Sequence, residues 1–552
     1  MQFKSRNFDA IPSALCVEDL TVALANSKLQ VLKGIDVTIR QGETVCLVGE
    51  SGSGKSVTSL AIMGLLPQAL EVSKGKINLQ GQNLLPLSQA QMRELRAARV
   101  AMIFQEPMTA LNPVLRIGDQ IMEVMELHTN LSQSERRKRA KAIMEQVHLP
   151  DVDRIFRSYP HQLSGGQRQR IMIAMALVLE PVLLIADEPT TALDVTTQKQ
   201  ILLLIDELQH KHGTAVLFIT HDMGVVAEIA DTVYVMKHGE VVEHGQAEQL
   251  LRHPREDYTR KLLSSVPSLM PRAPRSEGAE VVLSVERLNK VYGGDGILKK
   301  LPQAHAVKDV SFTLTRGRTL GIVGESGSGK STVARCIMRL IDPTSGRVVL
   351  DGSDIASLSR GALRPHRKKL QVVFQDPMRS LNPRWAIAQS LIEGPLNYGT
   401  SSYDAIAEAK RLLRVVGLPE DAMRRYPHMF SGGQRQRIAI ARAVMMRPNV
   451  LVADEAVSAL DVSVQAQVLE LLDQLQQEFG IAIVFITHDL RVAAQICDDL
   501  IVMQRGEVVE QGPASRILGA PAHAYTRALI DAAPGRNWDF QNFCSMNEVR
   551  IT

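Results

Sequence analysis

Short apolar runs and helical patterns alternate along most of this chain. Residues 44–48 and 320–323 are apolar runs of strand length, and helical sequence follows each of them after a short loop. Segments of alternating polarity come before these runs. Strands that alternate with helices predict an α/β fold with a largely parallel sheet, and the alternating segments predict an antiparallel strand region beside it.

The stretch between Gln105 and Ser164 has a different pattern. Its sequence pattern predicts mainly helix, including the highly charged residues 132–147. We therefore expect a helical subdomain between the strands of the sheet.

The second half of the chain repeats the first. YPHQLSGGQRQR at residues 159–170 returns as YPHMFSGGQRQR at residues 426–437. At the same spacing LLIADE returns as VLVADE, and FITHD returns unchanged. GESGSGKS occurs at residues 49–56 and again at residues 324–331. This last pair is offset by 275 residues rather than 267, so the second copy is eight residues shorter between this motif and SGGQ. Motifs that recur in one order, most of them at one offset, predict two copies of one structural unit.

A stretch rich in Pro, Ser and Arg separates the two copies. Such a composition predicts a linker with little structure of its own. The sequence therefore divides into a first unit at 1–263, a linker at 264–280, a second unit at 281–535 and a C-terminal tail at 536–552.

Composition and charge exclude several classes of protein. Hydrophobic residues make up 45% and charged residues 22%, which excludes a disordered or collagen-like chain. The net charge is only +4, with basic and acidic residues interspersed, so no nucleic-acid partner is predicted. The five cysteines lack CxxC spacing, which argues against a metal site or a disulfide framework.

No segment is predicted to span a membrane. The longest apolar stretch, residues 171–186, is interrupted by Glu180 and Pro181, and it is shorter than the ~20 residues that cross a bilayer. The first residues also lack the apolar core of a secretory signal. We expect the chain to stay on the cytoplasmic side.

The motif GxxxxGK[ST] occurs once in each copy, between an apolar strand and a helix. Its glycines allow backbone N–H groups to surround phosphate oxygens, its lysine neutralises them, and its hydroxyl holds magnesium. The predicted nucleotide-binding loops are Gly49, Glu50, Ser51, Gly52, Ser53, Gly54, Lys55 and Ser56, and Gly324, Glu325, Ser326, Gly327, Ser328, Gly329, Lys330 and Ser331.

Each copy also has an apolar strand that ends in Asp-Glu. Asp187 or Asp454 can hold magnesium at the carboxyl edge of the sheet. Glu188 or Glu455 can polarise the attacking water. Acidic residues in this place equally often cap the next helix, but two copies in register with the phosphate loops favour the catalytic interpretation.

The SGGQ motif stands directly before a helical run in each copy. A serine and free N–H groups at the start of a helix make an anion site, and a simple N-cap is the alternative interpretation. The candidate residues are Ser164, Gly165, Gly166 and Gln167, and Ser431, Gly432, Gly433 and Gln434.

LSGGQ placed between a phosphate loop and ADE resembles the signature of ATP-binding cassette (ABC) ATPases. The resemblance covers nearly the whole chain, twice. It implies ATP and Mg²⁺ as ligands, and two cassettes that pair with each other head to tail, so that each ATP lies between the phosphate loop of one and the SGGQ of the other. Lys55 would then work with Ser431, and Lys330 with Ser164.

The resemblance implies further roles for two glutamines and two histidines. Gln105 and Gln375 correspond to the glutamines that sense magnesium, water and the transmembrane partner. His221 and His488 correspond to the switch histidines near the γ-phosphate. For either histidine alone, core packing is the competing interpretation, but a position just after an apolar strand favours the switch role.

Two more pairs follow from the same resemblance. Asp194 and Asp461 match the loop that couples the two sites across their interface. ABC cassettes usually stack an aromatic side chain on adenine; Tyr292 fits that position in the second copy, whereas the first copy has Leu24. We therefore expect the first site to bind nucleotide more weakly without loss of catalysis.

Narrower details resemble the ATPases of oligopeptide, dipeptide, nickel and glutathione importers. They are QEPMTALNP at 105–113, QDPMRSLNP at 375–383, and the late HPREDYTRKLL and HAYTRALI segments. In relatives made of separate chains, cysteines after the YT segment hold an iron–sulfur cluster. Here the linker has no cysteine and the tail has only Cys544, so no such cluster is expected.

The leading hypothesis is an ATP-hydrolysing motor for import of a small solute, such as a peptide, a peptide-like compound including glutathione, or a chelated metal. The resemblance implies two separate transmembrane permease subunits, a periplasmic or extracellular solute-binding protein, and a place at the cytoplasmic face of the inner membrane. The alternative is a soluble tandem ABC ATPase that acts on ribosomes or DNA. Such proteins typically carry a long charged helical linker, inserted coiled coils or zinc-binding cysteines, and none of these is present in this sequence.

Overall fold

The computed structural model describes residues 8, 10–105, 110–190, 193–273, 275, 280–295, 300–458 and 460–546. Residues 106–109 of the first glutamine motif, 274 and 276–279 of the linker, and 547–552 of the tail lie outside the described residues. The chain forms two compact units. The first comprises Met1–Leu193, Thr197–Val266 and Pro534–Thr552, and the second comprises Asp194–Thr196 and Pro267–Ala533.

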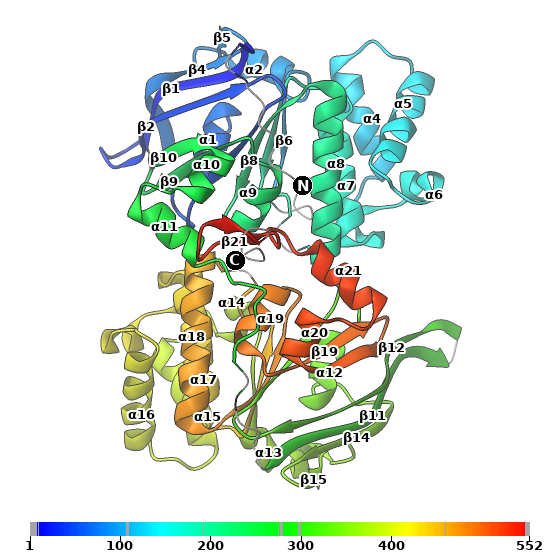
Figure 1. Cartoon of the computed structure of the whole chain (residues 1–552), viewed down its shortest axis with the longest axis vertical. Coiled ribbons are helices and arrows are strands. Elements are labelled where there is room, and N and C mark those ends of the chain that lie inside the picture. Colours follow the sequence, from blue (N-terminus) through cyan, green and yellow to red (C-terminus); the bar gives the residue numbers. More distant parts are fainter. Residues whose placement is uncertain are drawn as a thin grey trace. The chain divides into compact units, whose positions relative to one another are not determined.

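The first unit contains a large, mostly parallel sheet (Figure 1). Its strands pair in parallel except the edge strand at residues 240–246, which is antiparallel to its neighbour. The central strands are short and buried along their whole length, as expected for a sheet that is covered on both faces. The order is β10 (Glu240–Gln246), β9 (Thr232–Lys237), β3 (Thr44–Val48), β8 (Ala215–Thr220), β7 (Leu183–Asp187) and β6 (Val100–Ile103).

A smaller antiparallel sheet completes the strand content of the first unit's cassette. Its two longest strands combine buried side chains, such as Leu15, Val17 and Ile35, with exposed ones, as in a sheet with one face in the core. The order is β2 (Gln30–Arg40), β1 (Ser13–Leu24), β4 (Leu70–Leu79) and β5 (Gln82–Asn83).

The helices of the first unit fall into two groups. Three of them, α4 (Ile117–His128), α5 (Gln133–Gln146) and α6 (Val152–Arg157), lie at the opposite side of the unit from β1 and β2 in Figure 1. They confirm the helical subdomain predicted between Gln105 and Ser164. The remaining helices are α1 (Lys55–Ile62), α2 (Gln89–Leu95), α7 (Gly165–Leu177), α8 (Val195–His212), α9 (Met223–Ile229), α10 (Ala247–Arg252) and α11 (Asp257–Ser264), with a 3₁₀ turn η1 (Pro160–Gln162).

The second unit repeats this architecture. Its large sheet is again parallel except for one antiparallel edge strand, and its small sheet is antiparallel. The large sheet has the order β16 (Leu370–Val373), β17 (Val450–Asp454), β18 (Ala482–Ile486), β13 (Thr319–Val323), β19 (Asp499–Gln504) and β20 (Glu507–Pro513). The small sheet has the order β12 (Lys300–Thr315), β11 (Val281–Asp295), β14 (Ser345–Leu350) and β15 (Ser353–Asp354).

The helices of the second unit follow the same sequence of elements. The helical subdomain is built mainly from α15 (Ile387–Asn397) and α16 (Ser402–Val415). The others are α12 (Lys330–Ile337), α13 (Arg360–Lys369), α14 (Pro377–Ser380), α17 (Gly432–Val444), α18 (Val462–Phe479), α19 (Leu490–Ile496), α20 (Ala514–Gly519) and α21 (Ala524–Ala532), with 3₁₀ turns η2 (Glu420–Arg424) and η3 (Pro427–Met429).

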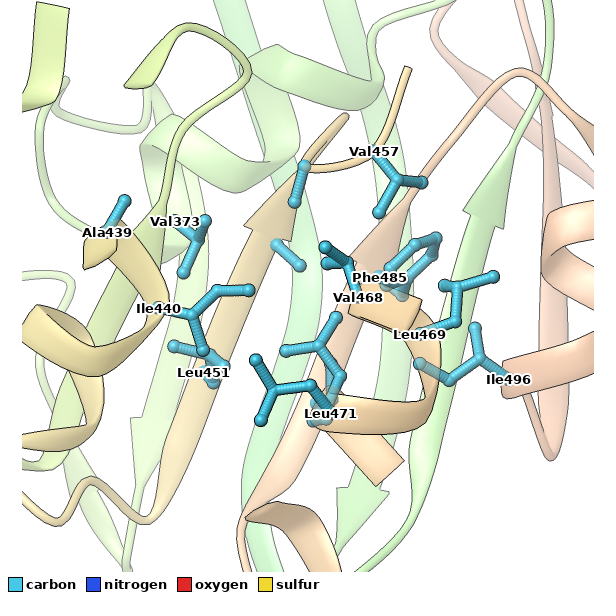
Figure 2. Close-up of a cluster of buried hydrophobic side chains, with 14 of the residues drawn as sticks. Val373, Ala439, Ile440, Leu451, Val457, Val468, Leu469, Leu471, Phe485 and Ile496 are labelled. Atoms are coloured by element: carbon cyan, nitrogen blue, oxygen red, sulfur yellow. The ribbon is translucent and has the colours of Figure 1, made fainter. Parts of the chain in front are cut away.

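The core of the second unit shows how helices and sheet are joined. Figure 2 shows Ile440 of α17 and Leu471 of α18 near side chains of the large sheet such as Leu451 and Phe485. Phe485 is completely buried, and burial of a side chain of this size contributes about 1.5–3 kcal/mol. This packing fixes the strand ends from which the functional side chains project.

The linker is held on the second unit by charged contacts. Residues 267–273 form no helix or strand. Arg272 forms ion pairs with Asp473 at 3.0 Å and with the fully buried Asp498 at 2.7 Å. Arg275 also pairs with Asp473. Arg272 and Arg275 therefore anchor the described part of the linker to the second unit.

The C-terminal tail belongs to the first unit. The short strands β21 (Trp538–Asp539) and β22 (Cys544–Ser545) pair as a hairpin. The backbone N–H of Gly535 donates to Glu228 of α9 at 3.1 Å, and the Arg252 guanidinium of α10 lies 5.4 Å from the centre of the Trp538 ring. Trp538 is buried. The chain thus leaves the second unit after α21 and ends as part of the first.

Among the described residues, we find no helix that combines the length and the apolar character needed to cross a bilayer.

Candidate active site

The phosphate loops begin directly after strands β3 and β13 of the two large sheets. Gly49 has φ of +152° and Gly324 has φ of +148°, conformations that side chains rarely adopt. A Cβ at either position would lie 2.3 Å from a backbone oxygen, that of Met236 or of Met503. A backbone oxygen cannot move aside as a flexible side chain can, so only glycine fits the start of each loop.

The lysine of each loop lies over the loop's own backbone. Lys55 Nζ donates to the carbonyls of Gly49 at 2.7 Å and Glu50 at 3.0 Å. Lys330 Nζ repeats these bonds to Gly324 and Glu325, at 2.7 and 2.8 Å. Burial lowers the pKa of Lys330, although nearby carboxylates partly offset the effect. Each unit therefore has a buried lysine Nζ at the loop where the motif predicts phosphate.

The serine of each loop is joined to the aspartate of the Asp-Glu pair. Ser56 Oγ donates to Asp187 Oδ1 at 3.2 Å, and Ser331 Oγ donates to Asp454 Oδ1 at 3.2 Å. Burial raises the pKa of both aspartates, and the serine hydrogen bonds oppose the shift. A hydroxyl and a carboxylate oxygen are ligands that Mg²⁺ accepts. These residues therefore fit a magnesium site, as expected from the sequence.

Glu188 is held by Gln105 and His221. Gln105 Nε2 donates to Glu188 Oε2 at 2.8 Å, and His221 Nδ1 lies 3.2 Å from Glu188 Oε1. Gln105 follows β6, Glu188 follows β7 and His221 follows β8, three neighbouring parallel strands. The carboxyl ends of these strands meet at one edge of the sheet, which brings the three side chains together.

The second unit has the same arrangement with one longer contact. Gln375 Nε2 donates to Glu455 Oε2 at 2.8 Å, whereas His488 Nδ1 lies 3.7 Å from Glu455 Oε1. Burial raises the pKa of the Glu455 carboxyl, but His488 and Lys330 outweigh burial and hold that pKa below its usual value. Glu455 is therefore ionised at neutral pH and can accept a proton.

The backbone of both glutamates is in the left-handed region. Glu188 has φ of +47° and Glu455 has φ of +49°. Non-glycine residues seldom adopt this conformation, and when they do it is often at functional sites. Hydrogen bonds from Glu188 N to Ile219 O and from Glu455 N to Ile486 O, both 3.0 Å, hold the turn.

The SGGQ motifs start helices α7 and α17 with a capping box. Ser164 Oγ accepts from Gln167 N at 3.3 Å, and the Gln167 side chain accepts from Ser164 N at 3.1 Å. Ser431 and Gln434 form the same pair of bonds. The local geometry thus agrees with the N-cap interpretation, and the exposed serines still present the helix start to solvent.

The remaining candidates lie at the ends of their elements. Asp461 is the N-cap position of α18, and Asp194 directly precedes α8. Tyr292 on β11 is 41% exposed, with the Lys290 ammonium 5.1 Å from its ring centre. Leu24 is the last residue of β1 and is half-buried.

Two tyrosines that were not predicted from the sequence as site residues contact the phosphate loops. Tyr258 of α11 accepts a hydrogen bond from Glu50 N at 3.2 Å. Tyr525 of α21 accepts one from Glu325 N at 3.1 Å. The signal was present, since both stand in a Tyr-Thr-Arg triplet that the duplication repeats in register.

The loops also contain hydroxyls that suit a ligand. Ser53 and Ser328 are each 4% exposed. Their Oγ atoms have no hydrogen-bond partner within the part of the chain that the structure describes. Buried hydroxyls are normally satisfied, so these two fit loops that complete their hydrogen bonding with bound phosphate.

Two α/β units that each place a phosphate loop beside an Asp-Glu pair define the class of P-loop ATPases. A family model described as ABC transporter matches residues 32–191 and 307–458. A second, described as oligopeptide/dipeptide transporter, C-terminal region, matches residues 242–293 and 509–541. The first model alone covers more than half of the chain, and the chain belongs to the ABC transporter family.

Curated relatives resemble the chain over almost its full length. The glutathione import ATP-binding protein GsiA of Escherichia coli is 47% identical over 95% of this chain and 90% of that protein. GsiA of Salmonella paratyphi A is 46% identical over 94% of this chain and 89% of that protein. Among solved structures, cbiO1 from Clostridium perfringens is 30% identical, with a TM-score of 0.38, over 44% of this chain and 92% of that one.

Proposed function

We propose that this chain is the ATP-hydrolysing subunit of an importer that takes up a peptide or a peptide-like solute such as glutathione. The observation that carries the proposal is the 47% identity to glutathione import ATP-binding proteins, which extends over 95% of the chain. The oligopeptide/dipeptide transporter C-terminal region matches at 242–293 and 509–541, which include the last helix of each cassette, and supports the same substrate class.

The site geometry supports a role for Glu188 and Glu455 as general bases. A carboxylate that lies beside the phosphate loop can accept a proton from water as the water attacks phosphorus. Gln105 and His221 hold the Glu188 carboxylate at both oxygens. At Glu455, Gln375 donates to one oxygen and His488 lies 3.7 Å from the other. Preset geometry of this kind lowers the cost of orienting the reacting groups.

The loop lysines and serines would bind the nucleotide phosphates. Lys55 and Lys330 can neutralise phosphate charge, while Ser56 with Asp187 and Ser331 with Asp454 would hold Mg²⁺, with Gln105 and Gln375 as further ligands. Bound magnesium would offset the charge that develops on the transferred phosphoryl group. The SGGQ serines are proposed to contact nucleotide, and their pairing with the opposite cassette rests on the family resemblance.

The partners are proposed from the family as well. The chain would work with two transmembrane permease subunits and a solute-binding protein that delivers cargo, at the cytoplasmic face of the inner membrane. Because cargo is recognised by those partners, the substrate class rests on the relatives rather than on residues of this chain.

Purification from mild detergent, followed by reconstitution, tests this function. We expect the tagged chain to co-purify with permease subunits, and proteoliposomes that contain the complex and the binding protein to take up labelled glutathione or dipeptide only with ATP. The matched control is the double variant Glu188→Gln with Glu455→Gln, which should bind ATP without uptake. Co-purification of ribosomes in place of membrane subunits would show that the alternative class is correct.

A further inference from the structure

A tyrosine hydroxyl contacts the second residue of each phosphate loop. Tyr258 accepts from Glu50 N and lies 208 residues from it in sequence; Tyr525 accepts from Glu325 N and lies 200 residues away. Both tyrosines are in the last helix of their cassette, within the segments matched by the oligopeptide/dipeptide transporter C-terminal region. The same contact therefore occurs twice in segments that are far apart along the chain.

The bond holds one side of a peptide unit whose other side is held by lysine. The carbonyl of Gly49 accepts from Lys55 Nζ at 2.7 Å, and the Glu50 N–H of the same peptide unit donates to the Tyr258 hydroxyl. The turn at Gly49 takes this N–H out of the strand, where it needs an acceptor. The tyrosine supplies that acceptor, so the direction of the following loop amides depends on it.

The tyrosines are themselves fixed in place. Tyr525 is 9% exposed, and burial raises its pKa to about 12, so the phenol stays neutral at physiological pH. The Lys237 ammonium lies 4.8 Å from the centre of the Tyr258 ring. Arg260 NH1 donates to the Pro254 carbonyl at 2.8 Å, which ties the start of α11 to the preceding loop.

We propose that Tyr258 and Tyr525 are positioning residues that preset the phosphate loops for nucleotide, so that the C-terminal helix of each cassette forms part of the nucleotide site. In these hydrogen bonds the tyrosines contact the phosphate loops and not the Glu188 or Glu455 carboxylates, so we assign their contribution to binding rather than to the chemical step. This inference rests on the proposed assignment of the two loops as nucleotide sites.

Removal of the hydroxyl alone tests the inference. Tyr258→Phe is made together with Lys330→Ala, and Tyr525→Phe together with Lys55→Ala, so that each measurement reports one intact loop. A hydrogen bond of this kind contributes about 0.5–1.5 kcal/mol, which corresponds to a rise of roughly two- to ten-fold in the Kd for ATP. Reconstituted with its partners, each single Phe variant should show a raised KM for ATP and an almost unchanged kcat.

Tyr234→Phe is the matched control. Tyr234 also accepts a hydrogen bond from a backbone N–H, that of Thr38 at 3.3 Å, and it is buried in the same cassette. We expect this variant to lose a comparable amount of thermal stability without a change in KM. Hydrogen–deuterium exchange should increase in residues 49–56 for Tyr258→Phe but not for Tyr234→Phe.

The outcomes separate the inference from the proposed function. If Lys55→Ala with Lys330→Ala abolishes ATP binding but neither tyrosine variant changes Kd or KM, the inference is wrong and the nucleotide sites stand. A fall in kcat at unchanged KM would also contradict it. If the double lysine variant binds ATP normally, the assignment of the loops is itself wrong.

Discussion

At the scale of single residues, Glu188 and Glu455 combine an unusual backbone with a restrained carboxylate. The left-handed conformation costs on the order of 1–3 kcal/mol, and a substitution by alanine would change the turn as well as the chemistry. Glutamine has the same shape and can keep the bond that Glu188 N donates to Ile219 O. It is therefore the substitution that separates proton transfer from structure.

We predict that Glu188→Gln or Glu455→Gln slows hydrolysis at the altered site by about 10²–10⁴-fold, because an amide cannot act as a general base. ATP binding should be nearly unchanged, since the phosphate loop keeps all its contacts. The measurement is bound ATP and single-turnover phosphate release for each variant. Normal turnover in both variants would remove these glutamates from the catalytic role.

The two adenine positions are also distinguished by one residue each. Tyr292 offers an exposed ring, whereas Leu24 offers only an aliphatic side chain. Aromatic stacking on a base contributes ~1–3 kcal/mol and leucine recovers part of it, so a difference of roughly 1 kcal/mol is expected. That difference corresponds to about five-fold weaker binding at the Lys55 site.

Leu24→Tyr is predicted to remove this asymmetry. Nucleotide titration in the Lys330→Ala background, which leaves only the first loop intact, should show tighter binding for Leu24→Tyr than for Leu24. The phosphate contacts are the same in both cassettes, so kcat should not change. Equal affinity with either side chain would mean that another group already covers that face of adenine.

At the scale of secondary-structure elements, the C-terminal tail belongs to a different unit from the residues that precede it in sequence. It follows α21 of the second unit, yet its hairpin packs against α9 and α10 of the first. Trp538 and Phe540 are 8% and 5% exposed. Gly535 has φ of +69°, and a Cβ there would lie 2.7 Å from the Cα of Gly224, so the approach of the tail to α9 requires glycine at this position.

Removal of residues 534–552 should therefore destabilise the first cassette and leave the second unchanged. Trp538→Ala alone should cost about 3–5 kcal/mol, the usual effect of truncating a large buried aromatic side chain. Differential scanning calorimetry of the full chain should show one transition moved to lower temperature. Two transitions that both keep their temperatures would contradict the role of the tail.

Tryptophan fluorescence gives a control for this experiment. The chain has 2 tryptophans, Trp385 and Trp538, one in each unit. Trp385→Phe leaves Trp538 as the single reporter of the tail. Its emission should shift to longer wavelength in step with the first-cassette transition, and an earlier shift would show that the tail detaches independently.

At the scale of the whole molecule, we propose that the glutamines connect the active sites to the helical subdomains. Gln105 stands between the end of β6 and the region that leads to α4, and its amide is bonded to Glu188. A partner that binds the helical subdomain can shift this amide relative to the carboxylate, provided that it binds the two positions with different affinity.

We predict that permease subunits stimulate ATP hydrolysis in proteoliposomes, and that Gln105→Ala with Gln375→Ala abolishes most of the stimulation. ATP binding by the double variant, measured in parallel, should stay close to that of the unaltered chain because the phosphate loops are not changed. Full stimulation of the double variant would show that coupling follows another route.

Much of the site could be predicted because its chemistry is contiguous in sequence. A phosphate loop, an Asp-Glu pair and an SGGQ motif each need only neighbouring residues and one flanking strand or helix. The apolar runs also predicted the strands from neighbouring residues alone. A strand that is buried along its whole length, such as residues 44–48, is apolar at nearly every position. The duplication then showed which motifs belong together.

The sequence by itself thus determined two α/β units, their loops and the residue types at each site. Only the tertiary structure decided that Gln105 and His221 hold Glu188, that Tyr258 holds Glu50, and that the tail completes the first unit. These contacts depend on the order β3, β8, β7, β6 in the sheet and on where the last helix packs. Strand order and long-range packing arise from the shapes of many buried side chains together. The hydrophobic periodicity and the motif spacing along the sequence therefore do not specify them.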